Sequence, residues 1–255
     1  MLKRPLAACA IIALALLLPP AGPATTAASR SASARATSAA LPTGFSQTLI
    51  ADGLNSPVAM TVAPDGRVFI AEQGGALRVV ENDALVEAPV LTVATSANSE
   101  LGLVGVTVSP RFPSEPFVYV TRTTDQPARH NQIVRYKVKG NSGDQESADV
   151  IADLDDLAAT DRVAGALRFG PDGMLYAATG DNTDGMKAQD MASTHGKLLR
   201  FGADGEIPPD NPFAGQASGR HRAIWASGLR NPFTFAFQPG SGRLPTTTCR
   251  WRCPI

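Results

Sequence analysis

Residues 228–232 (Gly-Leu-Arg-Asn-Pro) hold the side chain best suited to bind an anion. Arginine presents a planar guanidinium that matches oxygen-rich anions, so Arg230 is a candidate for contact with an acidic ligand. The alternative is a loop arginine that pairs with a carboxylate of the protein itself. Position alone favours that alternative, so a ligand-binding role for Arg230 needs further evidence from neighbouring motifs.

A second candidate for chemistry is the acidic stretch 181–185 (Asp-Asn-Thr-Asp-Gly). It has some features of a calcium loop, but it lacks the regular ligand spacing and terminal Glu of an EF-hand. We interpret it as a polar insertion loop, with cation binding as the weaker alternative, and we predict no metal ligands. The three histidines, His130, His195 and His221, match no motif and are interpreted as ordinary surface or loop residues.

The composition excludes several classes of function. The 255 residues include 23 basic and 23 acidic side chains, and no run of Lys or Arg occurs. Binding to nucleic acid requires clustered positive charge, so such a partner is excluded. The sequence also contains no phosphate-binding glycine loop, no Gly-x-Ser-x-Gly elbow and no paired-histidine zinc motif.

The N-terminus has the layout of a secretory signal peptide. Lys3 and Arg4 precede the apolar run 6–18, and prolines and small residues follow. This order predicts a signal peptide over residues 1–28 and a flexible Ser/Ala-rich spacer over 29–40, hence a secreted or periplasmic protein. The run is shorter than the ~20 residues that span a bilayer, so we expect no stable membrane insertion. A retained membrane anchor is the alternative.

From Phe45 onward the chain has the pattern of strands separated by Gly and Pro, with no long helical period. One unit recurs, in which an apolar strand meets a Pro-containing turn and an alternating strand returns. Pro-Asp-Gly, at 64–66 and 171–173, supplies the backbone angles of a tight turn. The predicted strands are 57–62, 67–71, 76–80, 90–93, 104–108, 117–120, 133–138, 150–154, 165–169, 174–178, 197–201, 232–237 and 243–244.

Turn signals at intervals of roughly 45 to 70 residues match four-stranded propeller blades with loop insertions. We therefore predict an all-β propeller over residues 41–242, with a two-sheet sandwich as the alternative. Three full units and the opening strand of a fourth are present, about three and a half blades. An array of this kind leaves a sheet edge open, which predicts self-association.

Five strings taken together resemble one family of six-bladed propellers, the soluble glucose/sorbosone dehydrogenases, over its N-terminal half. The strings are 53–57 with 63–72, 102–106 with 109–112, 169–176 with 179–181, 196–200 with 204–213, and 224–232. The string 210–213 (Asp-Asn-Pro-Phe) followed by 228–232 is the most specific of them.

The resemblance implies an activity, oxidation of an aldose or sorbosone to the lactone or acid with pyrroloquinoline quinone (PQQ) as acceptor and Ca²⁺ beside it. A histidine takes the proton from the sugar hydroxyl, and an arginine polarises the quinone oxygens. The family's Arg-Asn pair corresponds to Arg230 and Asn231, which would contact the cofactor. A further polar contact falls near Glu100, for which a solvated loop carboxylate is an equal alternative.

Arg162 departs from the family pattern. The family has His-x-Gly-Gly-x-Leu before the Phe-Gly-Pro-Asp-Gly turn, whereas residues 162–167 are Arg-Val-Ala-Gly-Ala-Leu. Arginine has no acceptor atom and stays protonated, so it cannot be the base. Ala164 also replaces a glycine and would crowd the backbone, and no spacing supports Asp161 as a substitute base. The chain is therefore either a sugar dehydrogenase or an inactive relative that binds a carbohydrate or a protein.

The last residues form a second departure, because the strand pattern is lost after Gly242. We predict an atypical tail over 243–255, produced by a reading-frame shift or an early stop. The alternative is a designed tail in which Cys249 and Cys253 pair or bind a metal, although two cysteines alone make a poor zinc site.

Overall fold

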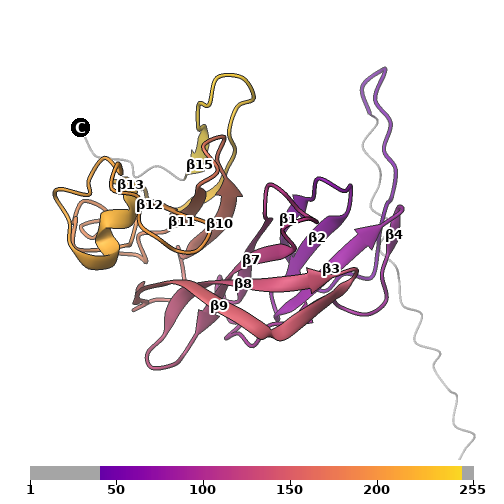
Figure 1. Cartoon of the computed structure of the whole chain (residues 1–255), viewed down its shortest axis with the longest axis horizontal. Coiled ribbons are helices and arrows are strands. Elements are labelled where there is room, and N and C mark those ends of the chain that lie inside the picture. Colours follow the sequence, from indigo (N-terminus) through magenta and orange to yellow (C-terminus); the bar gives the residue numbers. More distant parts are fainter. Residues whose placement is uncertain (1–40, 249–255) are drawn as a thin grey trace, which may run out of the picture. The chain divides into compact units, whose positions relative to one another are not determined.

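The computed structural model describes residues 41–248. The chain divides into residues 1–47 and residues 48–255, and every strand that the structure describes lies in the second unit (Figure 1). No helix among residues 41–248 has the length and apolar character needed to cross a membrane. The strands and the one 3₁₀ helix are β1 (Pro57–Val62), β2 (Val68–Glu72), β3 (Ala76–Glu81), β4 (Ala84–Leu85), β5 (Leu91–Thr92), β6 (Leu103–Val108), β7 (Phe117–Thr124), β8 (His130–Lys139), β9 (Ser142–Asp156), β10 (Ala164–Phe169), β11 (Leu175–Thr179), β12 (Leu198–Phe201), η1 (Gly219–Ala223), β13 (Ile224–Ala226), β14 (Pro232–Phe235) and β15 (Thr246–Thr248).

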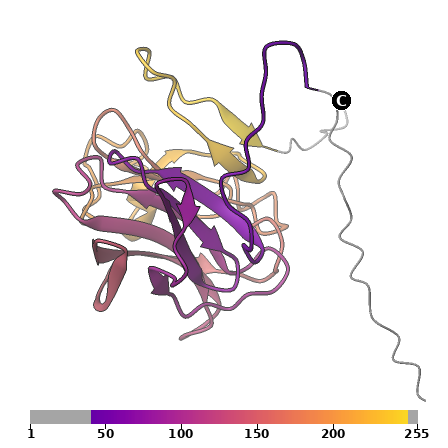
Figure 2. The same ribbon diagram turned by 90° about the vertical axis from the view of Figure 1, so that its right-hand side faces the viewer.

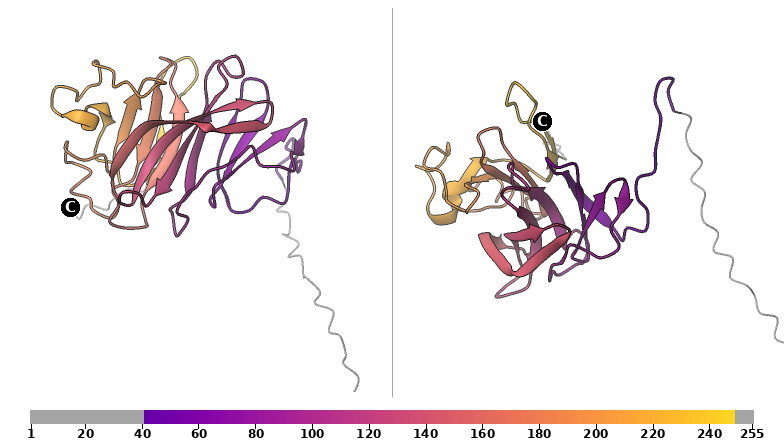
Figure 3. Two further views of the ribbon diagram at one scale, coloured as in Figure 1. Left: turned by 60° about the horizontal axis from the view of Figure 1, so that its bottom comes forward. Right: turned by 45° about the vertical axis from the view of Figure 1, so that its right-hand side comes forward.

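These strands form antiparallel sheets in chain order. The first is β1-β2-β3-β4 with β5 also paired to β3, the second is β6-β7-β8-β9, and the third is β10-β11-β12-β13. The first strands of successive sheets contact one another, β1 with β6, β6 with β10, and β10 with β14 (Figure 3). This is the neighbour order of propeller blades around an axis, and it excludes two sheets stacked face to face.

The predicted Pro-Asp-Gly turns connect the first two strands of the first and third sheets. Gly66 has φ +90° and donates its N–H to the oxygen of Ala63 at 2.9 Å. Gly173 has φ +75° and donates to Gly170 at 3.0 Å. Each turn therefore depends on a left-handed glycine that closes it, as expected for these tight connections.

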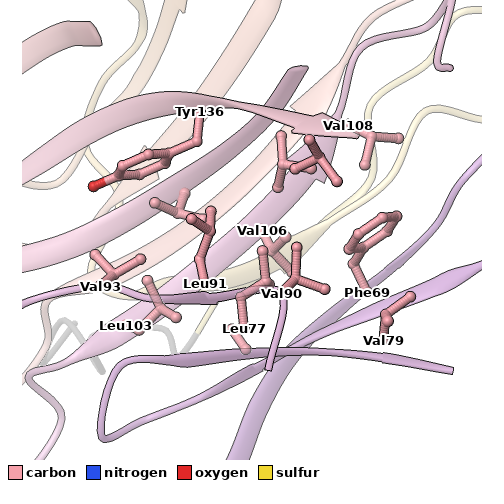
Figure 4. Close-up of a cluster of buried hydrophobic side chains, with 14 of the residues drawn as sticks. Phe69, Leu77, Val79, Val90, Leu91, Val93, Leu103, Val106, Val108 and Tyr136 are labelled. Carbon is pink, nitrogen blue, oxygen red and sulfur yellow. The ribbon is translucent and has the colours of Figure 1, made fainter. Parts of the chain in front are cut away.

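The hydrophobic core lies between neighbouring sheets. Between the first two sheets it includes Phe69, Leu77, Leu103 and Val106, all fully buried (Figure 4). An aromatic residue of each second strand contacts an aromatic residue of the next hairpin edge to face: Phe69–Phe112 at 5.6 Å, Tyr119–Phe169 at 5.1 Å and Tyr176–Phe237 at 4.9 Å. Such pairs add ~0.5–1.5 kcal/mol each beyond the burial of area. The same contact therefore recurs at successive interfaces, as a repeated unit predicts.

Most predicted strands are confirmed, but three details were wrong. The sequence did not reveal the short strands β4 and β13, and β13 completes the third sheet. The return strand expected at 243–244 instead lies at β15, paired with β14 (Figure 2). Strand structure therefore continues into the stretch that was expected to lack it. The predicted segments 1–28 and 29–40, Cys249 and Cys253 lie outside the described residues.

Candidate functional site

The first strand of every sheet is irregular at its beginning. The antiparallel register shifts between Pro57 and Ala59, between Leu103 and Gly105, between Ala164 and Leu167, and between Pro232 and Thr234. Such bulges re-aim side chains and are common beside active sites. Glu100, Arg162 and Arg230 lie just before three of these bulges, so the fold delivers all three predicted residues to the same end of the sheets.

Glu100 joins the start of β6 to the start of β10. Its Oε2 accepts hydrogen bonds from the backbone N–H groups of Arg162 at 2.7 Å and Val163 at 3.4 Å. Its own N–H donates to the oxygen of Thr160 at 3.2 Å. The alternative of a solvated loop carboxylate is therefore wrong in part, because Glu100 holds the backbone that presents Arg162.

Arg162 forms an ion pair with a carboxylate. Its Nη1 lies 3.5 Å from Oδ1 of Asp181, whose side chain is fully buried at the end of β11. The N–H of Asp181 donates to the oxygen of Arg230 at 2.7 Å. Asp181 thus links the two arginines. Its N–H binds the backbone of Arg230, and its carboxylate pairs with the side chain of Arg162.

Gly180 brings Asn231, the fourth predicted residue, into the same group. A Cβ atom at this position would lie 1.8 Å from the oxygen of Arg162 and 2.7 Å from Oδ1 of Asn231. Only glycine permits this approach, so the loops before β10 and β14 meet across it. The structure therefore brings Glu100, Arg162, Arg230 and Asn231 close together, and their roles toward a cofactor stay predictions.

The backbone of the Arg162 loop is strained. Arg162 and Ala164 have φ angles of +54° and +49°, in the left-handed region that side chains other than glycine rarely occupy. Next to them, a Cβ on Gly105 would lie only 2.0 Å from the oxygen of Gly165, so β6 and β10 approach closely. At Ala164, where the sequence predicted crowding, the structure shows an unfavourable backbone angle.

The acidic stretch 181–185 serves the protein's own structure. Oδ1 of Asn182 accepts the N–H groups of Ala158 at 2.7 Å and Ala159 at 3.0 Å. Oδ1 of Asp181 accepts the N–H of Thr183 at 2.9 Å. Within residues 41–248, no three His, Cys, Asp or Glu residues converge as metal ligands.

The three histidines all contact one segment, the end of β9. His130 Nε2 lies 3.0 Å from Oδ1 of Asp153, and His221 Nε2 lies 3.2 Å from Oδ2 of Asp155. His195 Nε2 lies 3.1 Å from the oxygen of Asp156, and burial lowers the pKa of this imidazole. His130 begins β8 and is buried, so its interpretation as a surface or loop residue was wrong.

The site geometry fits only part of the cofactor chemistry. PQQ carries carboxylates and quinone oxygens, and two guanidinium groups with a nearby amide suit such a ligand. Neither guanidinium can accept a proton. Asp161 begins the same loop, but it is exposed and its Oδ1 accepts a hydrogen bond from Ser99 Oγ at 2.6 Å. The described residues therefore suit binding of an acidic ligand better than removal of a proton from a sugar.

Comparison with known proteins decides the family. The model of the glucose/sorbosone dehydrogenase family matches residues 54–248. The chain belongs to this family, and its relatives include a quinoprotein glucose dehydrogenase and a PQQ-bound aldose sugar dehydrogenase. This match covers the three sheets, the β14–β15 hairpin and all four predicted site residues. The predicted fold class, an all-β propeller of this family, is confirmed.

Individual relatives agree with the family. Quinoprotein glucose dehydrogenase B of Acinetobacter calcoaceticus is 29% identical, across 78% of this chain and 47% of that protein. The aldose sugar dehydrogenase of Escherichia coli is 30% identical, across 80% and 56%. The PQQ-bound aldose sugar dehydrogenase of Streptomyces coelicolor is 29% identical and superposes with a TM-score of 0.67, across 78% and 58%. The chain therefore spans about half the length of the curated relatives it matches.

Sequence reasoning missed two residues of the site region. Asp181 ended a family string but was not linked to Arg162, because nothing local connects positions that meet only through sheet pairing. Lys197 follows the left-handed Gly196 and is fully buried, which is unusual for a lysine. The available signal was its place in the string 196–200. That string and 228–232 both belong to the set that carries the family resemblance.

Proposed function

We propose that this chain provides part of a PQQ and sugar site of the dehydrogenase family, and that it binds the cofactor without oxidising sugar. The observation that supports this most strongly is the ion pair between Arg162 and the buried Asp181. The residue at the family's proton-acceptor position is a cation held by a carboxylate. The site keeps groups that suit an acidic cofactor, and Arg162 supplies no base.

Arg230 and Asn231 are the residues proposed to hold the quinone. When bound, PQQ would supply the acceptor for a hydride from the sugar. Arg230 would donate hydrogen bonds to its oxygens, Asn231 would orient it, and Glu100 would keep the Arg162 loop in place. Calcium is not included, because the described residues supply no three-residue set of protein ligands for it.

The second candidate function is the family reaction itself, oxidation of an aldose or sorbosone to the lactone or acid. The intact Arg230-Asn231 pair favours it, because these residues serve the cofactor. The absence of an acceptor atom on Arg162 argues against it. If PQQ does not bind, the first proposal fails, and binding of a carbohydrate or of a protein partner without turnover is the remaining alternative.

We also propose that the chain is exported, as the pattern of Lys3, Arg4 and the apolar run 6–18 indicates. Fractionation of cells that express the full chain would test this. We expect a shortened protein outside the cytoplasm, and a full-length protein in the cytoplasm would contradict the proposal.

A titration with PQQ tests the binding function. We expect saturable binding by the purified chain, weakened roughly 10- to 100-fold by Arg230→Met, the effect of about 1.5–3 kcal/mol for hydrogen bonds to a charged group. Arg243→Met is the control, since Arg243 is an exposed arginine. Equal affinity of the two variants, or no binding by the unmodified chain, would refute the assignment.

A further inference from the structure

Lys197 is a buried cation that orders a loop. Its side chain is fully buried beside the start of β12. Nζ donates hydrogen bonds to the backbone oxygens of Lys187 at 2.8 Å, Ala188 at 2.9 Å and His195 at 2.8 Å. An ammonium group has three donors, and all three have acceptors here. One side chain therefore fastens both ends of segment 187–195.

The loop that carries Arg230 is docked on this same segment. The N–H of Gly228 donates to the oxygen of Ala188 at 2.8 Å, and the N–H of Leu229 donates to the oxygen of Gly196 at 3.0 Å. The oxygen of Ala188 thus receives hydrogen bonds from Lys197 and from the string that holds the candidate cofactor ligand. Arg230 inherits its position from backbone that Lys197 fixes.

The contact leaves little room for adjustment at Gly196. Its φ is +65°, and a Cβ there would lie 2.4 Å from the oxygen of Leu229 and 2.5 Å from Cβ of Ala188. Backbone packed this closely cannot shift independently on its two sides. A displacement of segment 187–195 should therefore move residues 228–230 with it.

We propose that Lys197 is a positioning residue, which sets segment 187–195 and through it the loop that presents Arg230 to the ligand. The part concerning ligand affinity rests on the proposed PQQ site. The part concerning the loop depends only on the hydrogen bonds above. The sequence placed this lysine in a family string but gave it no role, since it lies one strand away from any residue predicted to touch the cofactor.

The charge of Lys197 provides a signature of its own. Burial lowers its pKa to about 8, from 10.5 in solvent, with Asp190 and Asp155 partly opposing the shift. Lys187 and His195 are the other titratable groups on the segment. When the segment opens, Lys197 becomes exposed and binds its proton more tightly than it does in the closed segment. Between about pH 8 and 10.5, a rise in pH therefore favours the closed segment over the open one.

Lys197→Met tests the proposal, because it keeps an unbranched side chain and removes the donors. Lys139→Met, at an exposed lysine of β8, is the matched control. Hydrogen exchange of the Gly228 and Leu229 amides should accelerate by at least about tenfold in the first variant, the effect of roughly one lost hydrogen bond, and should not change in the control. Unchanged exchange in Lys197→Met would overturn the proposal.

A pH profile separates this role from general destabilisation, and its main readout comes from the unmodified chain. Trypsin cleavage after Lys187 is measured relative to a free peptide of residues 182–192. In the unmodified chain the relative rate should fall between pH 8 and 9.5, and Lys197→Met should show no such change. A rate in the unmodified chain that is constant or rises over this range would contradict the proposal.

PQQ titration of the same proteins distinguishes the two claims. If both hold, Lys197→Met binds PQQ about tenfold more weakly than Lys139→Met, the loss of about 1.4 kcal/mol. If neither protein binds PQQ while exchange and cleavage respond as expected, the proposed function fails and the loop role stands. If PQQ binds equally to both, Lys197 does not position the ligand site.

Discussion

Replacement of Arg67 by methionine should destabilise the contact between the first two sheets. Its Nη2 lies 2.8 Å from Oδ2 of Asp65, and Nη1 lies 2.9 Å from Oδ1 of Asn141 on the β8–β9 turn. The guanidinium carbon also lies 5.4 Å from the ring of Phe69 and 5.0 Å from that of Phe112. One side chain therefore connects a turn of the first sheet to two parts of the second.

The size of the stability loss in Arg67→Met follows from the burial of the Arg67–Asp65 pair. The Arg67 side chain is 9% exposed and that of Asp65 is 22% exposed. Burial raises the pKa of Asp65, but hydrogen bonds from Arg67 outweigh this and hold the pKa below its usual value. Breaking a fully buried pair costs about 3–5 kcal/mol, so with partial screening we expect about 2–4 kcal/mol. For a domain of this size that lowers Tm by roughly 5–15 °C.

Thermal unfolding followed by circular dichroism measures this effect. Arg129→Met is the control, because the Arg129 and Asp125 side chains are 42% and 48% exposed and such a pair contributes less than ~1 kcal/mol. The reasoning is refuted if both variants lower Tm equally. A second change, Asp65→Ala in the Arg67→Met background, should restore part of the loss, because it removes a carboxylate that has lost the guanidinium.

Three further predictions follow from single residues. Ala164→Gly should stabilise the fold by about 1 kcal/mol in urea unfolding, because it relieves a φ of +49°, and destabilisation would show that no strain exists. Burial and the hydrogen bond to Asp172 raise the pKa of Tyr176 from 10.0 to about 12, so stability should fall between pH 10 and 12, and Tyr176→Phe should remove that slope. We expect the chain to self-associate, which sedimentation measures. Phe233→Ser, at a side chain 57% exposed on β14, should weaken the self-association, whereas Met186→Ser on a loop should not.

The sequence predicted what depends on neighbouring residues. The Pro-Asp-Gly turns and the alternation of the following strands are local, so the hairpins were placed within one or two residues. The group formed by Glu100, Arg162 and Arg230 was also anticipated, but through a family pattern, since these residues are 62 and 68 positions apart. Their convergence depends on the order of the sheets.

The remaining features depend on tertiary contacts that no local pattern encodes. Strand β13 has three residues, too few to show alternation, and forms because β12 offers it an edge. The pairing of Asp181 with Arg162 requires two loops to meet across Gly180. Lys197 resembles a surface lysine in sequence, and its role depends on three backbone oxygens that only the folded loop brings together.

The most direct test of the proposed function is an assay of sugar oxidation. It uses purified protein whose bound PQQ has been shown by absorbance. The purified chain is loaded with PQQ in the presence of Ca²⁺ and given a panel of aldoses with a dye as electron acceptor. We predict bound PQQ and a dye reduction rate no higher than that of the same concentration of free PQQ, because Arg162 cannot take the sugar proton. Saturable, aldose-dependent turnover above that background would contradict the account.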